Sequence, residues 1–446
     1  MFTSPRKIFT ESAQDVGVYV HFPYCLQKCP YCDFNSHVPK RGQAYAPYTE
    51  AVLRELDARL PELMGGRLVS IFFGGGTPSL WAPQDVARVI DKIQSSLGMA
   101  TEITLEANPG AVERGKLGGF KDAGINRVSM GVQALDDALL RQLGRIHDRG
   151  EALEALAQIQ DTGFASHSID LIYAVPGQSP AAWQATMAEI VSLATPHVSA
   201  YNLTYEPGTL MSEWKEQGRV KPVSEEHEAV MFDMTYATFA AAGLAPYEIS
   251  NFAQPGHESI HNQLYWRSQK YLGVGAGAHS FTGHTRRGGV KAPAAYVSSW
   301  SGGALAPAPF ELEEQIDPAT HAHEQLLMGL RTQRGWDAAR SERELGVPAL
   351  AAARATADAH ADWCVFDGAQ LRPTHAGLLM NSALVLAASR ALDHHQADKK
   401  SHTPRVEELP ISSPRINRID GTPLAVTVAT ETERLAEAAQ GGRQGQ

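Results

Sequence analysis

The stretch Tyr19-Val-His-Phe-Pro-Tyr-Cys25-Leu-Gln-Lys-Cys29-Pro-Tyr-Cys32-Asp-Phe-Asn35 places three cysteines in a C-x3-C-x2-C pattern, directly after an apolar β-type segment at 16–20. Three thiolates on one tight loop can hold three corners of a [4Fe–4S] cube, which normally takes four cysteines. One iron is then left open for a small chelating ligand, such as the amino and carboxylate groups of S-adenosylmethionine (SAM). We therefore predict that Cys25, Cys29 and Cys32 ligate such a cluster.

Other uses of these cysteines stay open from the residues alone. They could be reduced side chains packed as small hydrophobic groups, or they could bind zinc with His21 or His37 as the fourth ligand. Zinc sites usually pair two C-x2-C knuckles, and this sequence has no second knuckle. A disulfide would leave one thiol over. The fourth cysteine of the chain, Cys364, is predicted to be an ordinary core residue.

The composition is that of an ordinary globular protein. The chain has 446 residues, 43% of them apolar, and 39 basic against 49 acidic side chains give a formal charge of −10. An acidic chain without basic runs argues against nucleic acid as a partner. The apolar stretches fall short of the roughly 20 residues of a transmembrane helix, and the N-terminus has no apolar signal region. We therefore expect a cytoplasmic protein, with peripheral membrane association left open.

Six short β-type segments alternate with helix-like segments through the first half of the chain. Strands are predicted at 16–20, 69–73, 102–106, 127–130, 168–172 and 197–203, and helices at 46–63, 83–97, 150–162 and 181–193. This alternation predicts parallel βαβ units, and six units suit an α/β fold with a partial (β/α)6 barrel of the TIM type. Ligands would bind at the rim where the C-terminal ends of the strands meet.

The chain divides into four predicted parts. They are the barrel with the cysteine loop at 1–210, a barrel extension at 211–310, a small winged-helix-like module at 318–392 and a tail at 393–446. The module is predicted from helical segments around a short hairpin at 363–371. The tail is rich in proline and polar residues, so it is predicted to be disordered because it buries too little apolar surface to offset ordering entropy.

Further candidate ligand residues follow the other predicted strands. The segment Phe73-Gly-Gly-Gly-Thr77-Pro78 lets a ligand approach the backbone and supplies a hydroxyl, although such a segment is also a common turn. Glu106 could accept hydrogen bonds from a ribose diol or cap the next helix. Gln133, Arg145 and Asp170 also lie at or after strand ends, where the Arg and the Asp could equally form a structural ion pair.

The segment His261-Asn-Gln-Leu-Tyr265-Trp266 combines a histidine with two aromatic residues. On a helix, His261 and Tyr265 share one face. A neutral imidazole could ligate a heme iron while the aromatic rings pack on the macrocycle. As one of 17 histidines, His261 could also be an ordinary core or surface residue.

Together, these segments resemble the coproporphyrinogen-dehydrogenase (HemN) branch of the radical-SAM superfamily over about residues 16–385. Within that branch the chain most resembles the HemW heme chaperones. HemN proteins carry a further cysteine two positions after the third, where this sequence has Phe34, and a longer segment before the first cysteine. The segment 261–266 matches the HNxxYW motif associated with heme binding in HemW.

The resemblance implies a chaperone that binds heme, with His261 at its site, and transfers it to an acceptor protein that the sequence does not identify. It also implies that Tyr19, Gly75 and Glu106 contact the cluster-bound SAM. Gly76 is included in the same cofactor-binding set, with the backbone around Tyr31 and Gly277 nearby. Four others lie where HemN proteins hold a second SAM: Thr77, Gln133, Arg145 and Asp170.

Two enzyme activities remain alternatives. One is the oxygen-independent decarboxylation of coproporphyrinogen III to protoporphyrinogen IX in porphyrin biosynthesis. The other is opening of the heme ring by a related methyltransferase.

Overall fold

The computed structural model describes residues 15–110, 115–301 and 310–401. It divides into two compact units: the first takes most of the chain up to Glu313, and the second takes Glu314 onward together with Tyr265–Ser268 and His284–Arg286. The predicted barrel (1–210) and its extension (211–310) therefore fall largely within one unit.

Six parallel strands form the centre of the first unit, and they lie side by side in sequence order. They are β1 (Asp15–Phe22), β2 (Arg67–Gly75), β3 (Glu102–Ala107), β4 (Arg127–Gln133), β5 (Ser166–Tyr173) and β6 (His197–Asn202). Each predicted strand coincides with one of these, so the predicted α/β fold with six parallel strands is confirmed. The C-terminal ends of the strands share one rim, as in other parallel α/β sheets.

Short strands extend this sheet at both edges to a total of 12 strands. β9 (Lys270–Val274) pairs in parallel with β1, and β10 (His279–Phe281), β11 (Thr285–Gly289) and β12 (Phe310–Gln315) follow it. At the other edge, β8 (Asn251–Ala253) and β7 (Ala245–Pro246) are antiparallel. The sheet is therefore mixed and wider than predicted. For β7, β8 and β10, segments of two or three residues are too short to show a strand period.

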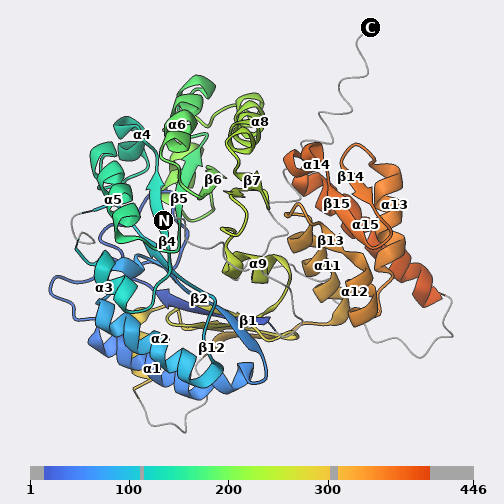
Figure 1. Cartoon of the computed structure of the whole chain (residues 1–446). Helices are drawn as coiled ribbons and strands as arrows, with labels where there is room; N and C mark the ends of the chain where they lie inside the picture. Colours follow the sequence, from blue (N-terminus) through green and yellow to red (C-terminus); the bar gives the residue numbers. More distant parts are fainter. Residues whose placement is uncertain (1–14, 111–114, 302–309, 402–446) are drawn as a thin grey trace. The chain divides into compact units, whose positions relative to one another are not determined.

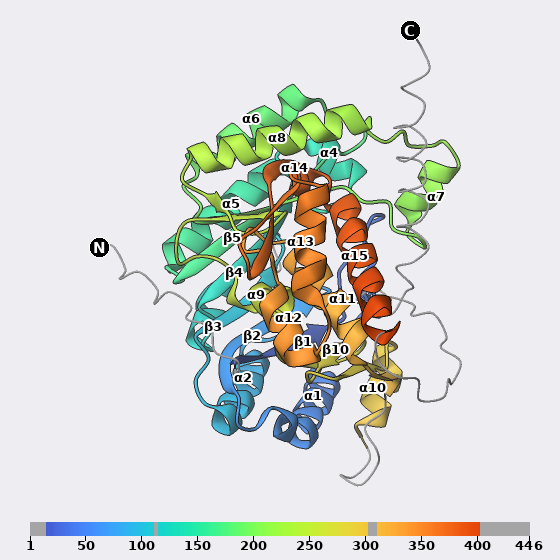
Figure 2. The same cartoon turned by 90° about the vertical axis from the view of Figure 1, so that its right-hand side faces the viewer.

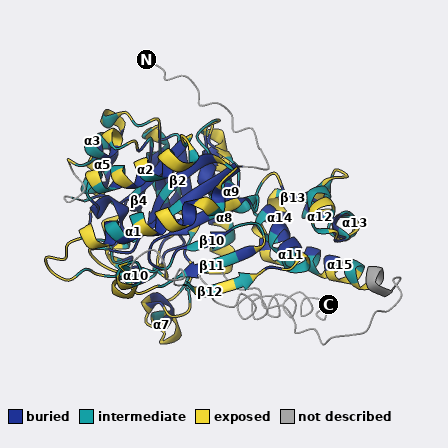
Figure 3. Cartoon of the chain, turned by 90° about the horizontal axis from the view of Figure 1, so that it is seen from below, coloured by how far each residue is buried: buried dark blue, intermediate teal, exposed yellow. Residues whose placement is uncertain are grey.

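Helices follow one another in an arc outside the six central strands (Figure 1). Figure 1 labels α1 (Ala46–Arg59), α2 (Pro83–Leu97), α3 (Leu117–Asp122), α4 (Asp137–Gln142), α5 (Arg149–Thr162), α6 (Pro180–Ser192) and α8 (Glu225–Ala241) there. The same unit also contains α7 (Leu210–Glu216) and α10 (Pro293–Ser299). In α2, Val86, Val89, Ile90 and Ile93 recur at helical spacing and are buried. Figure 3 shows the result: the strands are mainly buried, and the helices keep exposed outer turns.

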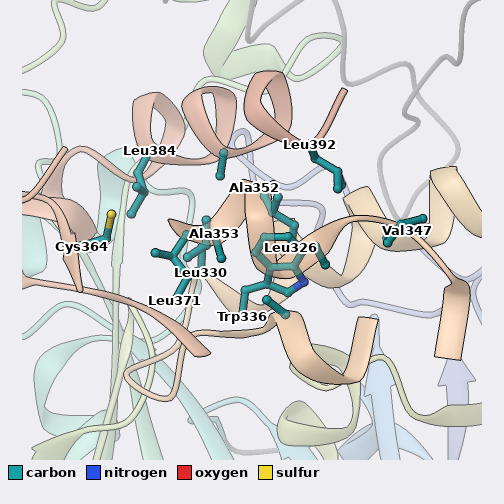
Figure 4. Close-up of a cluster of buried hydrophobic side chains, with 14 residues drawn as sticks. Leu326, Leu330, Trp336, Val347, Ala352, Ala353, Cys364, Leu371, Leu384 and Leu392 are labelled. Atoms are coloured by element: carbon teal, nitrogen blue, oxygen red, sulfur yellow. The ribbon is translucent and has the colours of Figure 1, made fainter. Parts of the chain in front are cut away.

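The second unit packs helices against a small antiparallel sheet of β13 (Trp336–Asp337), β15 (Gln370–Pro373) and β14 (Cys364–Phe366). The helices are α11 (Pro318–Gly329), α12 (Ala338–Leu345), α13 (Ala349–Ala359), α14 (His375–Leu379) and α15 (Asn381–Ser401), with α13 and α15 side by side (Figure 2). Its core gathers Leu326, Leu330, Trp336, Leu371 and Leu384 (Figure 4).

Cys364 lies in this core with 1% of its surface exposed, and burial raises the pKa of its thiol to about 11. The prediction of a core cysteine is confirmed.

The predicted tail begins too early, because α15 continues to Ser401 and residues 393–401 are helical. Leu384, Ala388 and Leu392 anchor the helix in the core, and adding turns to an anchored helix costs little. Residues 402–446 lie outside the described residues, so the prediction of disorder for them stays a prediction. In the described part of the chain, no helix has the length and apolar character needed to cross a membrane.

Candidate functional site

The cysteine loop, residues 23–38, follows the C-terminal end of β1, and backbone hydrogen bonds join its last residues to its first. The backbone amide of Cys25 donates to the carbonyl of His37 (3.0 Å), and the amide of His37 donates to the carbonyl of Pro23 (2.7 Å). Cys25, Cys29 and Cys32 are free thiols and partly exposed. Burial raises the pKa of the Cys25 thiol, and raises that of Cys32 to about 11. The loop therefore presents three thiols at the rim where they were expected.

The glycine segment after β2 holds the beginning of this loop. The amide of Gly76 donates to the carbonyl of Phe22 (2.7 Å), and the amide of Thr77 donates to the carbonyl of Tyr24 (2.8 Å). A Cβ on Gly76 would lie 2.7 Å from the Tyr24 oxygen, so the approach requires glycine. The Thr77 hydroxyl, itself buried, donates to the Cys25 sulfur at 3.4 Å. Gly76 and Thr77 thus orient the loop and one of its thiols.

Asn35 ties the far end of the loop to the glycine-rich stretch after β9. Its Nδ2 donates to the carbonyls of Ala276 and Lys291, both at 2.9 Å, and its Oδ1 pairs with Nε2 of His37 at 3.1 Å. Gly277 has a φ of +78°, and a Cβ there would lie 2.4 Å from the Asn35 Nδ2. The structure therefore places Gly277 against the cysteine loop, next to a residue that the sequence patterns did not single out.

Both histidines considered as zinc ligands have other partners. Nε2 of His21 lies 2.9 Å from the carbonyl of Asn35, so this nitrogen must be the donor, and Nδ1 accepts from the hydroxyl of Tyr19 at 2.9 Å. Burial lowers the pKa of His21 to about 4, so its ring is neutral at pH 7. Because His37 is held by Asn35, the donor set fits a three-thiolate cluster better than a zinc ion.

Arg145 reaches the loop from the segment after β4. Its Nη1 donates to the Cys29 sulfur at 3.5 Å, and its Nη2 donates to the carbonyl of Gly131 at 3.0 Å and to Oδ1 of Asn108. Its Nε is buried and has no hydrogen-bond partner among the described residues. A partly buried guanidinium whose buried Nε donor is unused fits a site that receives an anion, such as a cluster with thiolate ligands or a carboxylate.

Asp170 lies inside the barrel and binds two serines, not Arg145. Its carboxylate accepts from the hydroxyls of Ser129 (2.8 Å) and Ser199 (2.7 Å). Burial raises the pKa of Asp170, and these two hydrogen bonds work in the opposite direction. The alternative of an ion pair between Arg145 and Asp170 is wrong.

Glu106 is the second-last residue of β3, and the backbone amide of Gly75 in the glycine segment donates to its Oε2 at 3.1 Å. The next helix, α3, begins at Leu117 with Lys116 as its N-cap, so the alternative role of Glu106 as a helix cap is wrong. Burial and the charge of Asp170 together raise the pKa of Glu106 to about 8. Glu106 is partly exposed, which leaves its carboxylate within reach of a ligand.

Glu106→Gln is expected to stabilise the cluster-free protein in a pH-dependent way. In the folded protein the Glu106 carboxyl keeps its proton up to about pH 8, whereas in the unfolded chain it ionises near its ordinary pKa of 4.5. The free energy of unfolding of wild type therefore falls as the pH rises from 4.5 to about 8, and glutamine, which does not ionise, avoids this loss. The variant should melt at a higher temperature than wild type at pH 8.5, and the difference should shrink towards pH 5. Calorimetry at both pH values measures this; a difference that does not change with pH would contradict it.

Two further candidate residues lie on the same rim. Gln133 ends β4 with a φ of +67°, and the register of β4 against β5 shifts just before it. A non-glycine residue in the left-handed region is uncommon and is often found at functional sites. Tyr31 packs against an apolar cluster that includes Leu140 and Leu143, and burial raises the pKa of its hydroxyl.

His261 is buried inside the first unit, on α9 (Ile260–Trp266). It is 1% exposed, its Nδ1 pairs with the Ser70 hydroxyl at 2.8 Å, and its ring stacks on Phe72 at 5.0 Å between centroids. Burial lowers the pKa of His261 to about 3. In the described structure this imidazole is therefore enclosed by protein side chains.

Tyr265 and Trp266 belong to the second unit, so the HNxxYW segment is divided between the two units. The guanidinium of Arg331 lies over the Trp266 ring at 5.1 Å. The Trp266 Nε1 is buried and has no hydrogen-bond partner in the described part of the chain.

Asn35 and Asn108 are site residues that the sequence patterns did not reveal. Asn108 Nδ2 donates to the Thr77 hydroxyl at 3.0 Å, and Oδ1 accepts from Arg145. Asn108 lies two residues after Glu106, so the two-residue period of a strand would have placed it on the same face. No comparable signal marks Asn35, because its partners lie 241 and 256 residues away.

Comparisons with known proteins identify relatives of this chain. Residues 19–190 match the family model described as "Radical SAM superfamily". The chain is 38% identical over 268 residues to "Heme chaperone HemW" of Escherichia coli (strain K12), which is 59% of this chain and 69% of the relative. It is also 38% identical over 269 residues to "Radical S-adenosyl methionine domain-containing protein 1, mitochondrial" of Danio rerio, which is 60% of each chain and therefore less than two thirds of that relative.

Among solved structures, the chain is similar to coproporphyrinogen III oxidase (HemN) from Escherichia coli, described as a radical SAM enzyme. The TM-score is 0.71 at 20% identity, over 84% of this chain and 90% of that one. At this identity the likeness concerns the fold.

Proposed function

The chain belongs to the HemW family of radical SAM proteins, and on this basis we propose that it binds heme and delivers it to an acceptor protein. The observation that carries the proposal is the cysteine loop, which presents three partly exposed thiols at the rim of the barrel. Phe34 favours a chaperone over an oxidative decarboxylase, because it stands, 61% exposed, where HemN proteins carry a further cysteine.

The radical SAM family implies a [4Fe–4S] cluster and SAM, and the residues at the rim fit both. Cys25, Cys29 and Cys32 would hold the cluster, which with SAM supplies one-electron chemistry when bound. Arg145 would offset its negative charge, since Nη1 already contacts the Cys29 sulfur. Glu106 would accept the ribose hydroxyls of SAM.

The backbone around Gly75, Gly76 and Gly277 lies close to the same loop, with the rings of Tyr19 and Tyr31 nearby. We propose one SAM rather than two. Thr77, Arg145 and Asp170, three of the four residues considered for a second SAM, already bind protein partners.

Heme titration of the anaerobically reconstituted protein tests the chaperone proposal. We expect saturable binding of about one heme per chain, followed by transfer to an added heme-free b-type cytochrome, with both steps followed in the Soret band. The reaction belongs in a reducing compartment such as the cytoplasm, since the thiols must stay reduced.

The same preparation separates the chaperone from the two enzyme alternatives. Incubation with SAM, a reductant and coproporphyrinogen III should leave the substrate unchanged, and heme under the same conditions should keep its Soret band. Catalytic formation of protoporphyrinogen IX would identify an oxidative enzyme, and SAM-dependent loss of the Soret band would identify a ring-opening enzyme.

A further inference from the structure

We propose that His261 is a positioning residue for the cysteine loop and not a heme ligand. From inside the first unit its ring supports Tyr19, and Tyr19 and His21 connect it to Asn35 at the end of the loop. The comparison of heme binding between wild type and variants rests on the proposed function. The role of His261 in positioning the cysteine loop rests only on the contacts that connect His261 to Asn35.

The beginning of α9 is anchored inside the first unit by a buried carboxylate. Oε1 of Glu102, which is fully buried, accepts from the backbone amides of Ile260 (3.0 Å) and His261 (3.2 Å). These amides belong to the first turn of the helix, where no intrahelical partner exists. An acceptor of this kind fixes the helix start in place and with it the His261 side chain.

The imidazole is enclosed on several sides. The Ser70 hydroxyl pairs with Nδ1, and the ring of Phe72 lies nearly parallel to the imidazole at an interplanar angle of 26°. On the adjacent strand β1, Gly17 is the register partner of Ser70, and a Cβ there would lie 3.3 Å from Cε1 of His261 and 2.6 Å from Leu264. Gly17 thus provides the space in which α9 packs against β1. Axial ligation by His261 would require the macrocycle to displace these packed groups.

A continuous set of contacts runs from His261 to the cysteine loop. The His261 ring lies 6.2 Å from that of Tyr19, and Tyr19 stacks on Phe72 at 6.1 Å. The Tyr19 hydroxyl donates to Nδ1 of His21, and Nε2 of His21 donates to the carbonyl of Asn35, each at 2.9 Å. Burial raises the pKa of Tyr19 well above its ordinary value, so its hydroxyl stays protonated and remains a donor.

This chain of contacts ends three residues after Cys32. The side chain of Asn35 binds the carbonyls of Ala276 and Lys291, and its backbone carbonyl is held by His21, so the end of the loop is fixed by both sets of contacts together. A change at His261 or Tyr19 that frees the His21 ring removes one of these holds and should therefore alter how the loop holds a cluster. Outer contacts of this kind commonly tune a metal centre without touching it.

The test uses the full chain, reconstituted anaerobically, with His261→Gln and Tyr19→Phe. Tyr19→Phe removes only the hydroxyl and keeps the ring, whereas His261→Gln removes the ring and keeps an amide that can bind Ser70. We expect both variants to change the EPR spectrum of the reduced cluster and to shorten its lifetime in air by about threefold or more. Heme affinity and the heme EPR spectrum should match those of wild type.

His227→Gln is the matched control, since this histidine is exposed on α8 and should change neither cofactor. If His261→Gln does not fold, Ser70→Ala takes its place, because it removes the hydroxyl that binds the His261 imidazole. The same cluster and heme EPR spectra are then measured on Ser70→Ala. The inference would be overturned if His261→Gln lost the axial signal in the heme EPR spectrum while the EPR spectrum and air lifetime of its cluster stayed as in wild type. If Ser70→Ala is used in place of His261→Gln, the same result in that variant would overturn it. Failure of wild type to bind heme would overturn the proposed function instead, while the cluster measurements would still decide the role of His261.

Discussion

Cys29→Ala is expected to abolish cluster assembly. After anaerobic reconstitution, wild type should hold about four irons and four sulfides per chain, and the variant should hold almost none. Three protein thiolates are the minimum that leaves a single open iron, and Cys29 also contacts Arg145, the cation that balances the charge at this site. Iron and acid-labile sulfide analysis measures the loss directly.

Cys364→Ala is the matched control for this experiment. Its thiol is buried in the core of the second unit, so the variant should keep full iron and sulfide content and lose only about 1 kcal/mol of stability. Full cluster content in Cys29→Ala would contradict the assignment of the ligands. Reduced iron in Cys364→Ala would show that global stability, and not ligation, controls the iron content.

Glu55→Ala should have the largest effect on folding, lowering the free energy of unfolding by about 3–5 kcal/mol. Glu55 pairs with Arg59 at 2.8 Å, and both side chains are 3% exposed. Its other oxygen accepts from the Gly275 amide (2.9 Å) and the Tyr296 hydroxyl (2.7 Å). The variant would leave a buried guanidinium without its closest carboxylate, and two buried donors without their acceptor.

Glu50→Ala is a suitable control for the loss of a carboxylate from an ion pair. Glu50 pairs with Arg88 at 2.7 Å, but these side chains are 46% and 48% exposed, so the change should cost about 1 kcal/mol or less. Urea denaturation of both cluster-free variants gives the comparison. If both variants lost a similar free energy of unfolding, burial of the Glu55–Arg59 pair would not be the source of its contribution to stability.

Local patterns in the sequence were sufficient for the six central strands and for the loop with its three thiols. Strand and helix periods are properties of neighbouring residues, and the C-x3-C-x2-C spacing is contained within one loop. The same patterns missed the edge strands β7 to β12, of which β7, β8 and β10 have only two or three residues and cannot show a period. They also missed the helical residues 393–401, which continue a helix anchored by contacts made earlier in α15.

The sequence by itself determined the fold class, the cluster loop and the family, because each rests on spacings between residues close together in the chain. Only the tertiary structure decided the environment of His261. Ser70, its hydrogen-bond partner, lies 191 residues away, and Phe72 and Tyr19 come from other strands. The local sequence around a histidine next to aromatic residues is the same for a heme ligand and for a residue packed inside a barrel. Which of the two environments surrounds the side chain depends on contacts with distant strands, and these form only in the folded protein.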